Sequence, residues 1–142
     1  MKAVVIFESL TGNTRKAAGF IAAELERGGV PTTVSSTTAV DYQALAEADL
    51  VVVGTWTDGL VLFGQRPGRT GRLKKLPYFT GKKCAVFVTY AVDAGNVLDK
   101  FVAMMEDRGG DVIGGMAIRR NDLAGGAADF AGRVLDVVGV SK

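Results

Sequence analysis

Histidine is absent from this 142-residue chain, and cysteine occurs only once, as Cys84. Without histidine the chain lacks the commonest metal ligand of proteins, and one cysteine cannot form an intramolecular disulfide. No apolar run approaches the length of a membrane-spanning helix. The apolar run after Lys2 is also too short for a signal peptide, and no small-residue cleavage site follows it. The sequence therefore predicts a cytoplasmic protein without a membrane span and without a metal ligand set.

The composition is close to that of an average soluble globular protein. Apolar residues make up 48% of the chain and charged residues 23%, which argues against long disordered segments. A chain of this length fits one domain and buries a substantial core without disulfides. We therefore expect a single domain, residues 1–142.

Apolar or β-branched runs alternate with helical patterns along the chain. We expect strands at residues 2–7, about 30–36, 49–54, 84–88 and about 111–118. The helical patterns begin near residue 15, after Asp41, near residue 97 and near residue 125. The spacing in the first helix predicts a buried face made of Ala17, Phe20, Ile21 and Leu25. Residues from about 60 to 80 show weak periodicity and are expected to form a long loop.

This alternation predicts an α/β fold with one open, doubly wound, five-stranded parallel sheet and helices on both faces. Right-handed crossovers place the loops that follow the strands at the carboxyl edge of the sheet, where ligands of such sheets bind. A site at that edge is therefore the first functional expectation.

The segment between the first strand and the first helix is rich in hydroxyl groups. It consists of Ser9, Leu10, Thr11, Gly12, Asn13 and Thr14. Gly12 lets backbone N–H groups turn inward, and the helix N-terminus adds unpaired donors and a partial positive charge. An ordinary helix cap is the alternative, although a cap needs one hydroxyl and this segment has three. The segment therefore indicates a site for a phosphate monoester.

The Ser-x-Thr-Gly-Asn-Thr pattern of residues 9–14 resembles the FMN phosphate loop of the flavodoxin family, which also follows the first strand. The resemblance implies FMN as the cofactor and a parallel sheet of strand order 2-1-3-4-5. It also implies contacts to the flavin from Thr55, Trp56, Thr57, Asp58, Gly59, Thr89, Tyr90, Asp93 and Gly95.

Trp56 and Tyr90 are expected to stack on the two faces of the flavin ring, because aromatic side chains suit a flat π system. A place in the core is the alternative for Trp56 and, more strongly, for Tyr90. Asp58 and Asp93 are candidates for hydrogen bonds to the ring edge, with turn formation as the alternative for each. No residue is assigned a catalytic role, and no metal site is expected.

Two features depart from the family pattern. Many flavodoxins have glycine directly after the ring-binding aromatic residue, where this chain has Thr57. Typical flavodoxins are also acidic, whereas this chain has a pI of about 8.8. Its basic residues concentrate in residues 66–83, which contain Arg66, Arg69, Arg72, Lys74, Lys75, Lys82 and Lys83 and no acid. That stretch is a solvated loop, a docking surface for an acidic redox partner or a site for a nucleotide phosphate.

The sequence as a whole favours an FMN-binding electron carrier between separate redox partner proteins over a stand-alone oxidoreductase. The alternatives are an oxidoreductase linked to NAD(P)H or a quinol, and an interaction domain without flavin. A phosphoacceptor receiver domain is excluded because Gly54 and Thr55 stand where its aspartate is required. Nucleic-acid binding is not expected, since no known nucleic-acid-binding motif accompanies the basic stretch. Cys84 is interpreted as a small buried apolar residue.

Overall fold

The computed structural model describes residues 1–58 and 66–139. Its strands are β1 (Ala3–Phe7), β2 (Thr32–Ser36), β3 (Leu50–Asp58), β4 (Arg66–Pro67), β5 (Lys83–Tyr90) and β6 (Asp111–Arg119). Its helices are α1 (Asn13–Arg27), α2 (Tyr42–Glu47), α3 (Thr70–Leu73), α4 (Val97–Asp107) and α5 (Leu123–Val137), with a 3₁₀ turn at Arg120–Asp122. The chain therefore follows the alternation of strands and helices that its apolar pattern predicts.

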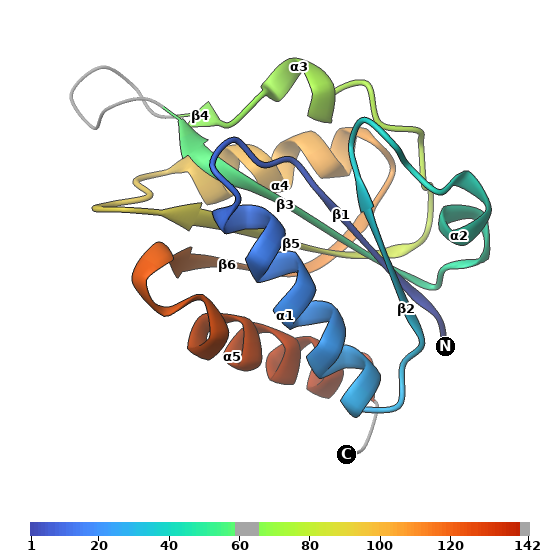
Figure 1. Ribbon diagram of the computed structural model, residues 1–142. Helices are drawn as coiled ribbons and strands as arrows, with labels where there is room; N and C mark the ends of the chain where they lie inside the picture. Colours follow the sequence, from blue (N-terminus) through green and yellow to red (C-terminus); the bar gives the residue numbers. More distant parts are fainter. Residues whose placement is uncertain (59–65, 140–142) are drawn as a thin grey trace.

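Five parallel strands form the main sheet in the order β2-β1-β3-β5-β6 (Figure 1). The short strand β4 pairs antiparallel with the end of β3. Counted among the parallel strands alone, the order is 2-1-3-4-5, which confirms the predicted fold. In the centre of the sheet Val5 of β1 lies opposite Val34 of β2 and Val52 of β3.

Helices cover both faces of the sheet, with α1 and α5 together on one face (Figure 1). Alternate residues of each strand point to opposite faces, so Val52 joins the core under α1 and α5. Val51 and Val53 join a second core, which α2, α3 and α4 cover. The continuous apolar runs of the central strands are needed because both faces of these strands are buried.

Helix α1 differs from the expectation in one residue of its buried face. Phe20 is 43% exposed, whereas Ala17, Ile21 and Leu25 are fully buried as predicted. Ala18 and Ala22 complete the buried face, so its centre lies on the opposite side of the helix from Phe20. The expectation for Phe20 was wrong because residues spaced three and four apart can be grouped into either of two neighbouring helix faces. The face that contacts the sheet is the one that contains Ala18 and Ala22, not the one that contains Phe20.

The third strand is longer than the sequence suggested. We expected β3 to end at Gly54 in a loop, but it continues to Asp58, and Thr57 lies opposite Pro67 of β4. Thr55, Trp56 and Thr57 are β-branched or aromatic and suit an extended strand. The expected loop from about 60 to 80 also contains β4 and α3, while residues 59–65 lie outside the described part of the chain.

Candidate functional site

A hollow of about 160 Å³ lies where the loop after β1 meets the carboxyl ends of β3, β5 and β6. It is lined by Leu10, Thr11, Asn13, Thr14, Trp56, Thr57, Thr89, Tyr90, Ala91 and Arg120. Eight of these ten residues are among the predicted cofactor contacts. Because parallel strands end at one edge of a sheet, segments far apart in the sequence meet here.

The loop after β1 presents backbone donors at this edge. Gly12 stands at the N-terminus of α1 with φ +96°, in the left-handed region that favours glycine. No side chain caps this helix end by a hydrogen bond, and the hydroxyl of Ser9 accepts from the backbone N–H of Gly12 at 3.0 Å. The first N–H groups of α1 and its partial positive charge are therefore suited to an anion.

Two buried hydroxyls connect this loop to β5. The hydroxyl oxygens of Thr14 and Thr89 are 3.0 Å apart, and both residues line the hollow. Since one hydroxyl donates to the other, the second keeps a proton for a ligand. The hydroxyl of Thr11 is exposed and accepts from Asn13 Nδ2 at 3.4 Å. Of the three hydroxyls noted in the sequence, those of Thr11 and Thr14 line the hollow, and that of Ser9 shapes the loop.

Two aromatic side chains line the hollow from neighbouring strands. Trp56 of β3 and Tyr90 of β5 are both half-buried. The guanidinium carbon of Arg69 lies 5.8 Å from the Trp56 ring centroid, and that of Arg119 lies 5.5 Å from the Tyr90 ring centroid. These rings offer flat apolar surface beside the anion-binding loop.

Thr57 contributes a hydroxyl whose oxygen is buried and has no hydrogen-bond partner among the residues that the structure describes. A buried hydroxyl without a partner costs on the order of 1–3 kcal/mol. Thr57 also lines the hollow. Its hydroxyl oxygen is itself covered by the protein, so other atoms of the residue form this part of the wall.

The other predicted site residues lie outside the walls of the hollow. Thr55 is fully buried and donates its hydroxyl to the carbonyl of Gly68 at 2.8 Å. Asp93 accepts from the backbone N–H of Gly95 at 3.0 Å, which is the turn considered as its alternative role. Asp58 pairs with β4 through the backbone, and Gly59 lies outside the described residues.

Sequence reasoning missed two residues of the hollow, Ala91 and Arg120. Arg120 directly follows β6, so the strand-end rule applied to the fifth predicted strand would have found it. None of the ten residues that line the hollow is acidic. Arg120 is the one charged side chain in this lining, whereas typical flavodoxins are acidic.

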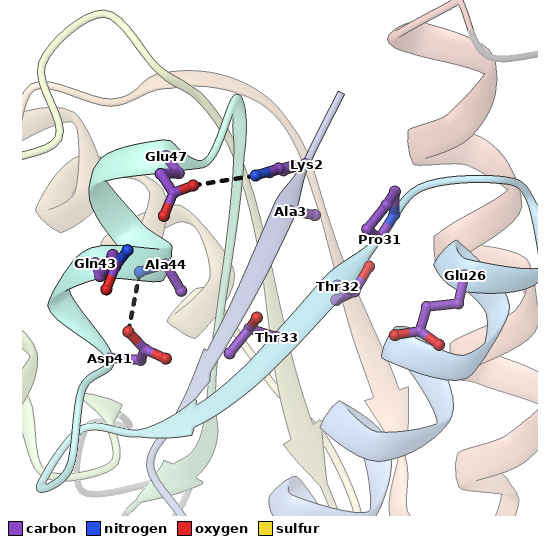
Figure 2. A pocket seen from close by; sticks show the side chains of 10 residues that line it. All are labelled: Lys2, Ala3, Glu26, Pro31, Thr32, Thr33, Asp41, Gln43, Ala44 and Glu47. Carbon is purple, nitrogen blue, oxygen red and sulfur yellow. Dashed lines mark hydrogen bonds and ion pairs between the residues drawn. The ribbon is translucent and has the colours of Figure 1, made fainter.

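A larger groove, of about 380 Å³, lies beside the amino ends of β1 and β2 (Figure 2). Three of its four charged side chains have partners: Lys2 Nζ is 3.0 Å from Glu47 Oε1, and Asp41 Oδ1 accepts from the Ala44 N–H at 2.9 Å. The second contact confirms Asp41 as the cap of α2. This groove is larger than the hollow at the strand ends, but of the two only that hollow combines aromatic rings with the anion-binding loop, so we take the hollow as the candidate site.

Cys84 lies fully buried in the core on the α4 side, as predicted. Burial raises the pKa of its thiol to about 12, so the reactive thiolate is scarcely populated at neutral pH. Within residues 1–58 and 66–139, no helix is long and apolar enough to cross a membrane. The same residues contain no group of three or more acidic or cysteine side chains placed to hold a metal ion.

The fold and the hollow define a class of protein: a doubly wound α/β domain with a glycine-containing loop at a helix N-terminus and aromatic side chains at the carboxyl edge of its sheet. The family model described as "Flavodoxin domain" matches residues 4–107, which is more than half of the chain. The chain belongs to the flavodoxin family, whose members are flavoproteins of electron transport.

Solved structures agree in fold. The flavodoxin of Streptococcus pneumoniae TIGR4 is 23% identical, with a TM-score of 0.73 and coverage of 96% of this chain and 99% of that one. The two-electron reduced flavodoxin of Megasphaera elsdenii is 22% identical, with a TM-score of 0.66 and coverage of 89% and 98%. Rubredoxin oxygen:oxidoreductase of Desulfovibrio gigas is 16% identical, with a TM-score of 0.68, and 99% of this chain matches 37% of that longer one. The comparison with curated proteins gave no significant match.

Proposed function

We propose that the chain acts as one domain that binds FMN and carries electrons between separate redox proteins. One observation carries the proposal: the anion-binding loop at the start of α1 and the rings of Trp56 and Tyr90 line the same hollow. A phosphate and a flat ring of one molecule are the two groups that such an arrangement accommodates. Bound FMN would supply the one- and two-electron chemistry.

In this proposal the protein residues bind and orient the cofactor. The loop formed by residues 9–14 holds the phosphate, and Trp56 and Tyr90 flank the ring. Thr57 follows Trp56 in β3 and forms part of the wall at the ring edge. Thr55, Asp58, Gly59, Thr89, Asp93 and Gly95 complete the proposed contacts or support them.

Trp56→Ala tests the ring site. We expect the fluorescence of FMN to be quenched in the unmodified complex and largely recovered in the variant. The loss of stacking of about 1 kcal/mol should weaken binding roughly fivefold, or more once buried area is included. Tyr42→Ala, on the exposed side of α2, is the matched control and should change neither quantity. If FMN separates from the unmodified protein during gel filtration, the interaction domain without flavin becomes the better proposal.

Arg120→Gln tests the charge of the site. A guanidinium at the wall favours negative charge on a reduced ring, so its removal should lower the two-electron midpoint potential. An interaction of about 1 kcal/mol corresponds to roughly 20 mV for two electrons. Arg133→Gln removes an exposed arginine that pairs with Asp129 and is the control. Equal potentials in the two variants would show that Arg120 does not act on the ring.

The basic stretch, residues 66–83, divides into two parts in the structure. Arg69 and Arg72 lie near the carboxyl end of β1 and pair with Glu8. Lys82 donates to the carbonyls of Ala46 and Ala48, just before the amino end of β3. We propose that an acidic redox partner docks at the first part, where Lys74 and Lys75 are exposed. Partner binding that is unaffected by Lys74→Glu and Lys75→Glu would contradict this.

A simple experiment distinguishes the alternative function, an oxidoreductase linked to NAD(P)H, from the electron carrier. Bleaching of the bound flavin by NADPH alone, without a second protein, would favour it over the carrier. We place the carrier in the cytoplasm, where thiols such as that of Cys84 remain reduced.

A further inference from the structure

A carboxylate is buried beside the proposed FMN loop. The side chain of Glu8 is only 2% exposed. Its Oε1 accepts hydrogen bonds from Arg69 Nη1 at 2.9 Å and from Arg72 Nη1 at 2.8 Å. The hydroxyl of Thr37 donates to its Oε2. A buried carboxylate is tolerated in a protein only when it is paired and hydrogen-bonded, and these contacts supply both.

The carboxylate joins segments that are distant in the sequence. Glu8 stands between the end of β1 and Ser9, the first residue of the loop. Arg69 and Arg72 are 61 and 64 residues away in the chain and belong to the segment that contains β4 and α3. The ion pairs therefore fasten that segment to the carboxyl end of β1.

The same segment supports Trp56. The backbone N–H of Gly68 donates to the carbonyl of Trp56 at 2.8 Å. The indole ring lies directly on Gly68, because a Cβ atom built there would be 2.2 Å from Trp56 Cδ2 and Cε2. Residue 68 must therefore be glycine for the ring to keep this position. Trp56 lines the hollow, and Gly68 does not.

Arg69 follows Gly68 in a strained conformation. Its φ is +48°, which makes it the only residue other than glycine with positive φ in the described part of the chain. Such a conformation persists only where surrounding contacts fix it. The contacts of Arg69 include the ion pair with Glu8 and, at its carbonyl, hydrogen bonds from the backbone N–H groups of Arg72 at 2.9 Å and Leu73 at 3.3 Å. The strained residue therefore directly follows the glycine that supports Trp56, and its side chain is held by Glu8.

We propose that Glu8 is a positioning residue: through Arg69 and Arg72, its carboxylate sets the place of Trp56 in the wall of the cofactor hollow. This inference rests on the proposed FMN function for its effect on binding. Loss of the carboxylate leaves two guanidinium groups without their acceptor and releases the segment that supports the indole ring.

Glu8→Gln tests the inference, because it keeps the shape of the side chain and removes its charge. Trp56 is the only tryptophan, so intrinsic fluorescence of the flavin-free full chain reports on it alone. We expect stronger quenching by acrylamide and a lower anisotropy in the variant. We also expect FMN and riboflavin to bind about tenfold more weakly, and to the same extent, which is the order of one lost charged hydrogen bond.

Matched variants keep the test decisive. Glu47→Gln removes an exposed carboxylate that pairs with Lys2 and should leave Trp56 and both affinities unchanged. Arg72→Gln leaves Glu8 one arginine and should give a smaller change in the same direction, so it decides the matter if Glu8→Gln does not fold. Arg72→Lys restores the charge and should recover most of the protection of Trp56.

Equally weakened binding of FMN and riboflavin, together with a more accessible Trp56, supports the inference. Unchanged accessibility of Trp56 in a folded Glu8→Gln variant overturns the inference. Weaker binding of FMN with unchanged binding of riboflavin also overturns it, since Glu8 would then act on the phosphate loop. If the unmodified protein binds no flavin, the proposed function fails, and the accessibility of Trp56 still decides whether Glu8 positions it.

Discussion

Replacing Thr11 and Thr14 together by alanine should weaken FMN binding by roughly 10²- to 10⁴-fold. Each hydroxyl would donate to a phosphate dianion, and a hydrogen bond to a charged acceptor contributes about 1.5–3 kcal/mol. Two such bonds amount to about 3–6 kcal/mol, or some two to four powers of ten in the dissociation constant. Calorimetric titration of the unmodified protein and the variant measures the difference.

Riboflavin is the control ligand, because it has the ring of FMN but no phosphate, and its affinity should change little in the double variant. Thr14→Ala also removes the hydrogen bond to Thr89. Thr89→Val removes the same bond together with the Thr89 hydroxyl, so its effect on FMN binding sets an upper limit on the part of the loss that is due to that bond. Both variants need a measured free energy of unfolding before the affinities are compared. Riboflavin binding to the unmodified protein as tightly as FMN would rule out a phosphate site at residues 9–14.

Gly54→Ala should lower the free energy of unfolding by about 2–3 kcal/mol, because overpacking of a filled core costs about 1–3 kcal/mol and sometimes more. A Cβ atom at Gly54 would lie 2.0–2.5 Å from three atoms of the Phe87 ring, on the neighbouring strand β5. The ring cannot move far, since it packs against Phe130 with centroids 5.9 Å apart. Urea unfolding followed by circular dichroism measures the loss.

Gly114→Ala is the matched control: Gly114 is also in a strand, but nothing lies within 4 Å of its added Cβ atom. It should be neutral or slightly stabilising. Phe87→Leu makes room beside Gly54, so adding it to Gly54→Ala should cost less than the sum of the two single changes. Strict additivity would mean that the clash with Phe87 is not the cause of the loss.

The features of the fold could be predicted from the sequence to different degrees. The alternation of strands and helices is local information, since the period of apolar residues depends on each segment's own contact with the core. Phe20 shows the limit of that information: the pattern allowed it a buried position, and contact of α1 with the sheet left it exposed. The continuation of β3 beyond Gly54 likewise depends on other strands: β5 pairs with it as far as Trp56, and β4 pairs with Thr57 and Asp58.

The sequence by itself determined the loop formed by residues 9–14, because strand, glycine, hydroxyls and helix start follow one another within a few residues. It also placed Trp56 and Tyr90 at strand ends, and a parallel sheet brings such ends to one edge. Only the tertiary structure decided that Arg120 joins them and that Glu8 pairs with Arg69 and Arg72. The physical reason is distance along the chain: those pairings depend on how separate strands and loops pack together, and no local pattern of residues records that packing.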